Sequence, residues 1–162
     1  MSRLAVLGVG GNMGDAKETI QLAIEKLSMV LGDLDASSSF YETNAWGYEN
    51  QPNFINAVTG FITDKDPLQV LEACLNIERE LGRNRVGVEK WSQRLIDIDV
   101  LYVDDLEIST EKLTLPHSYI EQRNFVLVPL NEVYPEYLHP GLKMTSKELL
   151  EACTDKGMVK KI

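Results

Sequence analysis

Two helix-forming segments, each lying between strand-like segments, most restrict the folds open to this chain. In residues 15–32 and 67–82, apolar side chains recur at three- and four-residue spacing, which is the pattern of an amphipathic helix. The first segment begins with an N-capping aspartate and the second with a proline, and both end at glycine. Short apolar or alternating segments predict strands over 4–9, 54–62 and 95–103, and the polar-rich segment 36–43 resembles a further strand.

The order of these elements, β-α-β-β-α-β, predicts an α+β fold with a ferredoxin-like core, in which an antiparallel sheet carries helices. Residues 104–162 are expected to add a small hairpin near 104–108 and short helices around 121–133 and 145–153. At 162 residues, the whole chain, 1–162, is expected to form a single domain.

Charge and composition narrow the class of protein. The net charge of −9 argues against a partner that is nucleic acid or an anionic membrane surface. No apolar run approaches the roughly 20 residues that a membrane-spanning helix needs. Cys74 and Cys153 are too few for a disulfide framework, so we expect a reducing compartment, the cytoplasm. We expect a monomer, with a homodimer as the alternative.

The stretch RLIDIDVLYV, residues 94–103, places two aspartates in an otherwise apolar strand. Residues two apart in a strand face the same way, with Cα atoms about 6.6 Å apart, so Asp97 and Asp99 share one face. Two carboxylates this close repel each other, and a divalent cation between them would offset the repulsion. Two carboxylates with open coordination positions suit Mg²⁺, which also takes phosphate oxygens.

The segment before this strand carries the opposite charge. Residues 78–94 hold five basic and three acidic side chains, together with Trp91. Arginine side chains can bind phosphate oxygens with two hydrogen bonds, and an indole ring can stack on a flat ring. Carboxylates for a metal ion, basic side chains for phosphate and an aromatic side chain for a ring together predict a nucleotide phosphate-transfer site. The spacing of the aspartates alone is equally consistent with the solvated face of an edge strand, and a basic segment alone with a solvated charge run.

Several separated motifs, in order along the chain, resemble the 6-hydroxymethyl-7,8-dihydropterin pyrophosphokinase family of the folate pathway. The first is Trp91-x-x-Arg94-x-x-Asp97-Ile98-Asp99. The others are Gly10-Gly11-Asn12, Phe40-Tyr41-Glu42-Thr43, Gln51-Pro52-Asn53-Phe54-Ile55-Asn56, Leu115-Pro116-His117 and Arg123-Asn124-Phe125-Val126-Leu127-Val128-Pro129-Leu130.

The resemblance implies transfer of pyrophosphate from ATP to the hydroxymethyl oxygen of the pterin, with release of AMP. It implies two Mg²⁺ ions held by Asp97 and Asp99, and catalytic roles for these two residues with Arg83 and Arg94. The pterin-binding positions that it implies are Thr43, Asn44, Ala45, Trp46, Phe54, Asn56, Trp91 and Phe125. The nucleotide-binding positions that it implies are Glu78, Arg83, Arg85, Lys90, Trp91, Arg94, Ile98, Lys112, Thr114, His117 and Arg123.

The sequence also departs from the family pattern. Lys90, Ser92 and Gln93 stand where Arg, Gly and Pro are usual, which removes an arginine fork and a rigid turn. Lys112 replaces a usual arginine, and Asn44-Ala45 replaces prolines that are common after the threonine. These changes bear on rate and affinity more than on the type of reaction, because both aspartates remain.

Two other functional classes compete with this interpretation. The first is a non-catalytic ferredoxin-like module that binds a pterin or a nucleotide without turnover. The second is a dinucleotide-binding oxidoreductase, suggested by Gly8-Val9-Gly10 between a strand and a helix. The dinucleotide motif needs a third glycine at position 13, where Met13 stands, so the pyrophosphokinase interpretation is favoured.

Overall fold

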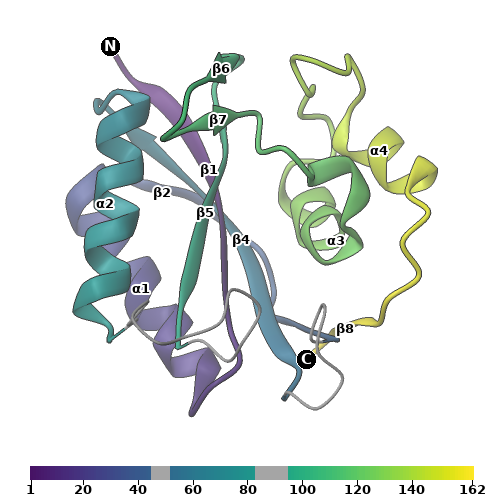
Figure 1. Cartoon of the computed structure of the whole chain (residues 1–162), viewed down its shortest axis with the longest axis horizontal. Coiled ribbons are helices and arrows are strands. Elements are labelled where there is room, and N and C mark those ends of the chain that lie inside the picture. The colour runs from purple at the N-terminus through teal and green to yellow at the C-terminus, as the bar shows by residue number, and fades with distance from the viewer. Residues whose placement is uncertain (45–51, 83–94) are drawn as a thin grey trace.

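The computed structural model describes residues 1–44, 52–82 and 95–162, and its fold is shown in Figure 1. In chain order, the elements are β1 (Arg3–Gly11), α1 (Ala16–Leu31), β2 (Leu34–Ser37), β3 (Tyr41–Thr43), β4 (Phe54–Thr63), α2 (Pro67–Glu80), β5 (Asp97–Val103), β6 (Ile108–Ser109), β7 (Thr114–Leu115), a 3₁₀ turn (Ile120–Gln122), α3 (Asn124–Val133), α4 (Ser146–Ala152) and β8 (Val159–Lys161).

The main sheet has the strand order β5-β1-β4-β3-β8, and β2 also pairs with β4. Every pairing in it is antiparallel. The predicted α+β fold with a ferredoxin-like antiparallel core is therefore confirmed. Among the described residues, no helix is both long and apolar enough to span a membrane.

The helices start where the sequence provides caps. The carboxylate of Asp15 accepts a hydrogen bond from the backbone of Glu18 at the start of α1. Asp66 and Gln69 form a reciprocal capping box at α2, which begins at Pro67. These bonds satisfy backbone N–H groups that the helix itself cannot pair, and they set the predicted helix starts.

Three details differ from the sequence-based expectation. The strand predicted over 36–43 is two strands, β2 and β3, because Ser38 interrupts it with a side chain that accepts a hydrogen bond from the Val58 backbone. The hairpin predicted near 104–108 lies further on, as β6 and β7, because Asp104 adopts a positive φ of 49° and ends β5 in a turn. The third is β8, which was not expected, since three residues are too short for a periodic signal.

The sheet separates two layers of helices, with α1 and α2 on one face and α3 and α4 on the other (Figure 1). Each face has its own apolar cluster. The cluster under α1 and α2 includes Leu7, Phe61 and Ile98, and the cluster under α3 includes Leu101 and Tyr102. The two layers leave the sheet covered on both sides, which places any open site at the margins of the helices.

A polar contact ties α3 to the sheet. Glu132 accepts hydrogen bonds from the Ser39 backbone at 2.9 Å and from the Tyr41 hydroxyl. Burial alone would raise the pKa of Glu132, but the hydrogen bonds from Tyr41 and Ser39 outweigh it and hold the pKa below its usual value. The carboxylate therefore stays charged at neutral pH and joins β3 to the C-terminal half of α3.

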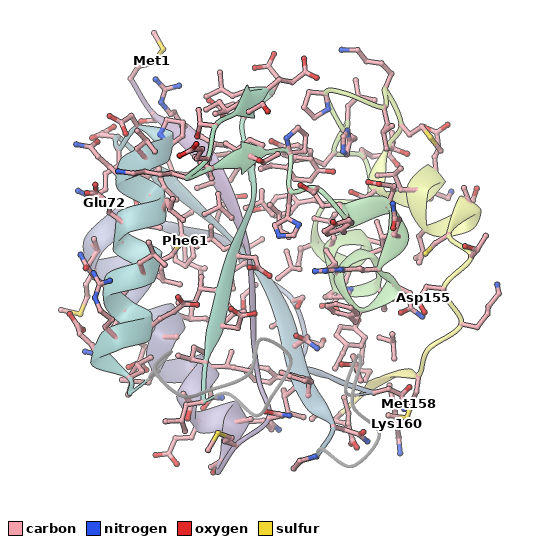
Figure 2. All side chains as sticks on the ribbon, in the orientation of Figure 1. Met1, Phe61, Glu72, Asp155, Met158 and Lys160 are labelled. Atoms are coloured by element: carbon pink, nitrogen blue, oxygen red, sulfur yellow. The ribbon has the colours of Figure 1, made fainter. Side chains whose placement is uncertain are left out.

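Phe61 is the large side chain at the centre of the α1 and α2 face, and it is completely buried (Figure 2). We expect Phe61→Ala to reduce the free energy of unfolding by about 3–5 kcal/mol, because it removes buried surface and leaves a cavity. The neighbouring Ile62 is 37% exposed, and Ile62→Ala is expected to cost less than about 1 kcal/mol. Urea denaturation of both variants tests this, and equal losses would contradict the assignment of the core.

Candidate active site

Asp97 and Asp99 lie on the open face of β5, as the sequence predicted. Both are partly exposed, and the side chain of Asp99 is 41% exposed. Ile98 and Val100 point to the opposite face, where they are buried in the cluster under α1 and α2. The alternation of the strand thus buries the apolar residues and leaves both carboxylates at the surface of a recess.

Glycine neighbours separate each carboxylate from the next side chain across the sheet. Asp97 pairs with Gly10, and Gly10 pairs in turn with Asn56. One row along, Asp99 pairs with Gly8. Adjacent strands lie about 4.8 Å apart, so the backbones at Asp97 and Asn56 are separated by roughly 10 Å, and Gly10 between them contributes no side chain.

Gly10 could not be any larger residue without rearrangement. A Cβ built on it would lie 2.2 Å from Oδ1 of Asn56 and 3.2 Å from the Ile55 carbonyl oxygen. A strand glycine often marks such a close approach. The side chain of Asn56 therefore lies with its Oδ1 toward Gly10 on β1, and its Nδ2 donates to Oγ1 of Thr43 on β3, the other neighbour of β4, at 2.7 Å.

One pocket, which we call the α3-side pocket, opens between this glycine floor and the start of α3. All five described residues of the predicted pterin set line it, and so do both aspartates. The residues lining the α3-side pocket are Gly8, Val9, Gly10, Thr43, Asn44, Phe54, Asn56, Ala57, Val58, Asp97, Asp99, Leu101, Arg123, Phe125 and Val126.

A second pocket, the α2-side pocket, lies on the other side of the two carboxylates. Five of the six described residues of the predicted nucleotide set line it, and the sixth, Arg123, lines the α3-side pocket instead. The residues lining the α2-side pocket are Leu71, Leu75, Glu78, Asp97, Ile98, Asp99, Val100, Lys112, Leu113, Thr114, His117 and Ser118.

Glu78 anchors β5 between the two aspartates. Its carboxylate accepts the backbone N–H of Ile98 at 2.8 Å, and its side chain is almost fully buried at 2% exposure. β5 is the outer strand of the sheet at this edge, so a side chain from α2 takes the place of a further strand. This bond holds the backbone that carries Asp97 and Asp99.

His117 approaches the carboxylates from the segment after β7. Its Nε2 lies 4.0 Å from Oδ1 of Asp99, and its Nδ1 accepts a long 3.5 Å hydrogen bond from the Tyr119 backbone. Burial, followed by the nearby Arg123 guanidinium, lowers the pKa of His117 below its ordinary value. The lowered pKa favours the uncharged ring at neutral pH, and the contact of the Tyr119 N–H with Nδ1 favours the tautomer with its proton on Nε2, the nitrogen nearer Asp99.

Arg123 lies over two aromatic rings at the mouth of the α3-side pocket. Its guanidinium carbon is 4.9 Å from the Tyr119 ring centre and 5.7 Å from that of Phe125. Cation–π contacts at these distances orient the guanidinium. Asn12, two residues after Gly10, donates from its side chain to the carbonyl of Pro52 at 3.1 Å.

The two carboxylates are better suited to Mg²⁺ than to a metal ion that needs many ligands from the protein. Among residues 1–44, 52–82 and 95–162, no group of three or more His, Cys, Asp or Glu side chains could hold a metal ion. Mg²⁺ is commonly bound by one or two carboxylates with waters and substrate phosphates completing its shell. The carboxylates of Asp97 and Asp99 match this coordination preference.

Part of the predicted site lies outside the described residues. These positions are Ala45, Trp46, Arg83, Arg85, Lys90, Trp91 and Arg94. Conversely, Gly8 and Gly10 line the site but were not among the predicted site residues. Two glycines at alternate positions of a strand were the available signal, because they leave one face of that strand bare.

Comparison with known proteins decides the family. Residues 6–135 match the family model described as 7,8-dihydro-6-hydroxymethylpterin-pyrophosphokinase (HPPK). The chain belongs to the HPPK family. Its HPPK relatives include the 2-amino-4-hydroxy-6-hydroxymethyldihydropteridine pyrophosphokinases of Aquifex aeolicus, at 41% identity over 88% of this chain and 87% of that protein, and of Haemophilus influenzae, at 32% identity over 96% of each.

Solved structures show the same HPPK fold. The crystal structure of Plasmodium falciparum HPPK-DHPS with pteroate superimposes with a TM-score of 0.74 at 18% identity, over 93% of this chain and 44% of that one. A triple mutant of the same protein gives a TM-score of 0.75 at 20% identity, with the same coverage. This chain thus spans less than half the length of these structural relatives.

The glycine floor can be tested with a matched pair of variants. We expect Gly10→Ala to lower the free energy of unfolding by about 1–3 kcal/mol, because the new methyl group displaces Asn56 from its bond to Thr43. Gly8→Ala should cost less, since its Cβ would meet Leu101 at an ordinary 3.7 Å. Chemical denaturation measures both, and a larger loss for Gly8→Ala would contradict this account.

Proposed function

We propose that this protein transfers the β,γ-pyrophosphate of ATP to the hydroxymethyl oxygen of 6-hydroxymethyl-7,8-dihydropterin, giving AMP and the pterin diphosphate. One observation carries the proposal. Asp97 and Asp99 line both pockets at once, so a reaction between two ligands would occur at the carboxylates where the pockets meet. Membership of the HPPK family supports the identity of the two ligands.

The α3-side pocket suits the pterin. Phe54 and Phe125 supply aromatic surface that can stack on a bicyclic ring. Asn56, oriented by Thr43, offers an amide to the polar edge of that ring. Ala45, Trp46 and Trp91 complete the proposed pterin set from outside the described residues.

The α2-side pocket suits the nucleotide. Lys112 and Thr114 bring a cation and a hydroxyl group, and apolar side chains of α2 cover the other wall. His117 contributes an uncharged N–H donor beside Asp99. The phosphate-binding side chains proposed for the segment before β5 are Arg83, Arg85, Lys90 and Arg94.

In the proposed reaction, the hydroxymethyl oxygen attacks the β-phosphorus of ATP. A bond forms between that oxygen and phosphorus, the bond from the β-phosphorus to the bridging oxygen of the α-phosphate breaks, and AMP leaves with the bonding electron pair. Asp97 accepts a hydrogen bond from the attacking hydroxyl and orients it, and the released proton passes to water. Positioning and neutralisation of charge carry most of such a transfer.

We propose that Asp97 and Asp99 hold two Mg²⁺ ions with the triphosphate. The ions would neutralise phosphate charge and align the reacting groups. The half-exposed carboxylates leave room for phosphate oxygens and water, which Mg²⁺ retains in its shell. Glu78 serves the metal site indirectly, because it holds the β5 backbone between the two ligands.

We also propose that the chain works as one domain and as a monomer in the cytoplasm, with a homodimer as the alternative. Both apolar clusters share the same sheet, which supports a single folding unit. Light scattering on the purified chain would distinguish the monomer from the homodimer.

A non-catalytic module is the competing function. Such a module could use the aromatic pocket, but binding an uncharged pterin does not need two adjacent carboxylates. Incubation with Mg-ATP and 6-hydroxymethyl-7,8-dihydropterin separates the two functions. We expect AMP to form in step with the pterin diphosphate. ADP would indicate transfer of a single phosphoryl group, and ATP binding without any product would support the non-catalytic module.

Asp97 gives the sharpest test of the metal site. We expect Asp97→Ala to reduce turnover more than about a hundredfold, because the transfer loses a carboxylate at its centre. The circular dichroism spectrum should stay unchanged, since Asp97 is not part of either apolar cluster. Asp105→Ala, an exposed aspartate in the turn after β5, is the matched control and should keep full activity. Full activity in Asp97→Ala would overturn the assignment.

A further inference from the structure

The segment between α4 and β8 joins the two walls of the α3-side pocket. This segment, residues 153–158, leaves α4, passes the start of α3 and leads into β8 beside β3; Figure 2 labels Asp155 and Met158 in it and Lys160 in β8. One wall of the pocket carries Arg123 and Phe125, and the opposite wall carries Thr43 and Asn44. No part of this segment lines either pocket.

Asp155 caps α3 from a position 31 residues further along the chain. Its Oδ2 accepts the backbone N–H of Asn124, the first residue of the helix, at 3.1 Å. The preceding residue, Arg123, provides no side-chain cap of its own. A carboxylate at this end satisfies an unpaired N–H and matches the positive end of the helix dipole.

The Asn124 side chain strengthens the same junction. Its Nδ2 donates to the carbonyl oxygens of Gly157 at 2.7 Å and Asp155 at 3.3 Å. The other carboxylate oxygen of Asp155 accepts the N–H of Gly157 at 2.9 Å, which closes a tight turn. The turn and the start of α3 thus form one hydrogen-bonded unit between the two residues, 123 and 125, that line the pocket.

The segment then binds the opposite wall. Oδ1 of Asn44 accepts the backbone N–H of Met158 at 2.6 Å. From there β8 pairs with β3 in register, with Val159 opposite Thr43 and Lys161 opposite Tyr41. The acceptor in this bond is an oxygen of the Asn44 side chain and not a backbone carbonyl. In this chain, therefore, the pocket wall is joined to the C-terminal segment through a side chain.

We propose that Asp155, Asn124 and Asn44 are positioning residues that set the separation of the two walls around the pterin. The inference rests on the proposed function. Asp155 and Asn124 line neither pocket and act through Phe125, whereas Asn44 lines the α3-side pocket and also holds it to the C-terminal segment. Loss of these hydrogen bonds would weaken binding of the pterin and leave ATP binding unchanged.

Steady-state kinetics with both substrates tests the proposal. For Asp155→Ala, Asn124→Ala and Asn44→Ala, we expect the KM for the pterin to rise about tenfold, the change that one lost hydrogen bond can produce. The KM for ATP should stay within about twofold. Asn44→Asp retains an acceptor oxygen for the Met158 N–H, so it should restore the pterin KM nearly to the wild-type value.

Thr145→Ala is the matched control for stability. It removes the cap of α4, which packs on α3 away from the pocket, and so loses an interaction of the same kind. We expect it to lower the melting temperature as Asn44→Ala does, without a selective rise in the pterin KM. If Asp155→Ala does not fold, Asn124→Ala decides, because it removes the bonds to the Asp155 and Gly157 carbonyls at a residue that lines neither pocket, and it leaves the Asp155 cap of α3 in place.

Two further outcomes would overturn the inference. A pterin KM within about twofold of wild type in Asn44→Ala, or equal rises of both KM values, would show that the segment only stabilises the fold. A folded wild-type protein that makes no AMP would overturn the proposed function itself and this inference with it. Wild-type activity measured in the same assay therefore separates the two failures.

Discussion

The site depends on the central position of β1, which pairs with β4 on one side and β5 on the other. Its side chains at positions 5, 7 and 9 are buried beneath α1 and α2, while positions 8 and 10 on the opposite face are glycines. One face of β1 therefore contributes side chains to the core, and the other face forms the floor of the recess without side chains. Any side chain at position 10 would occupy the space that Asn56 now uses.

The second helical layer turns that floor into a pocket. α3 lies across the face that carries the two glycines, and the start of α3 brings Phe125 and Arg123 over the recess. Glu132 binds β3 at the other end of α3, and Asp155 caps its beginning. Glu132 belongs to α3 itself and Asp155 comes from the segment between α4 and β8, so polar contacts at both ends hold the helix in place.

Much of the fold could be predicted from local sequence patterns. The two helices have caps and apolar spacing in the sequence, and the alternation of β5 placed Asp97 and Asp99 on one face. These features depend on neighbours within a few residues, so a linear pattern records them. The split of the predicted 36–43 strand, the position of the hairpin and the existence of β8 depend on partners far along the chain. Segments this short contain too few residues for a periodic pattern to predict such pairings.

By itself, the sequence determined the order of the elements, the shared face of the two aspartates and, through its motifs, the family. The tertiary structure alone decided that Asp97 and Asp99 line two pockets, that Arg123 lies on the α3 side, and that Asn44 is joined to the C-terminal segment. The physical reason is distance along the chain. Residues 44 and 158, or 78 and 98, meet only when the sheet register and helix packing bring them within hydrogen-bonding range.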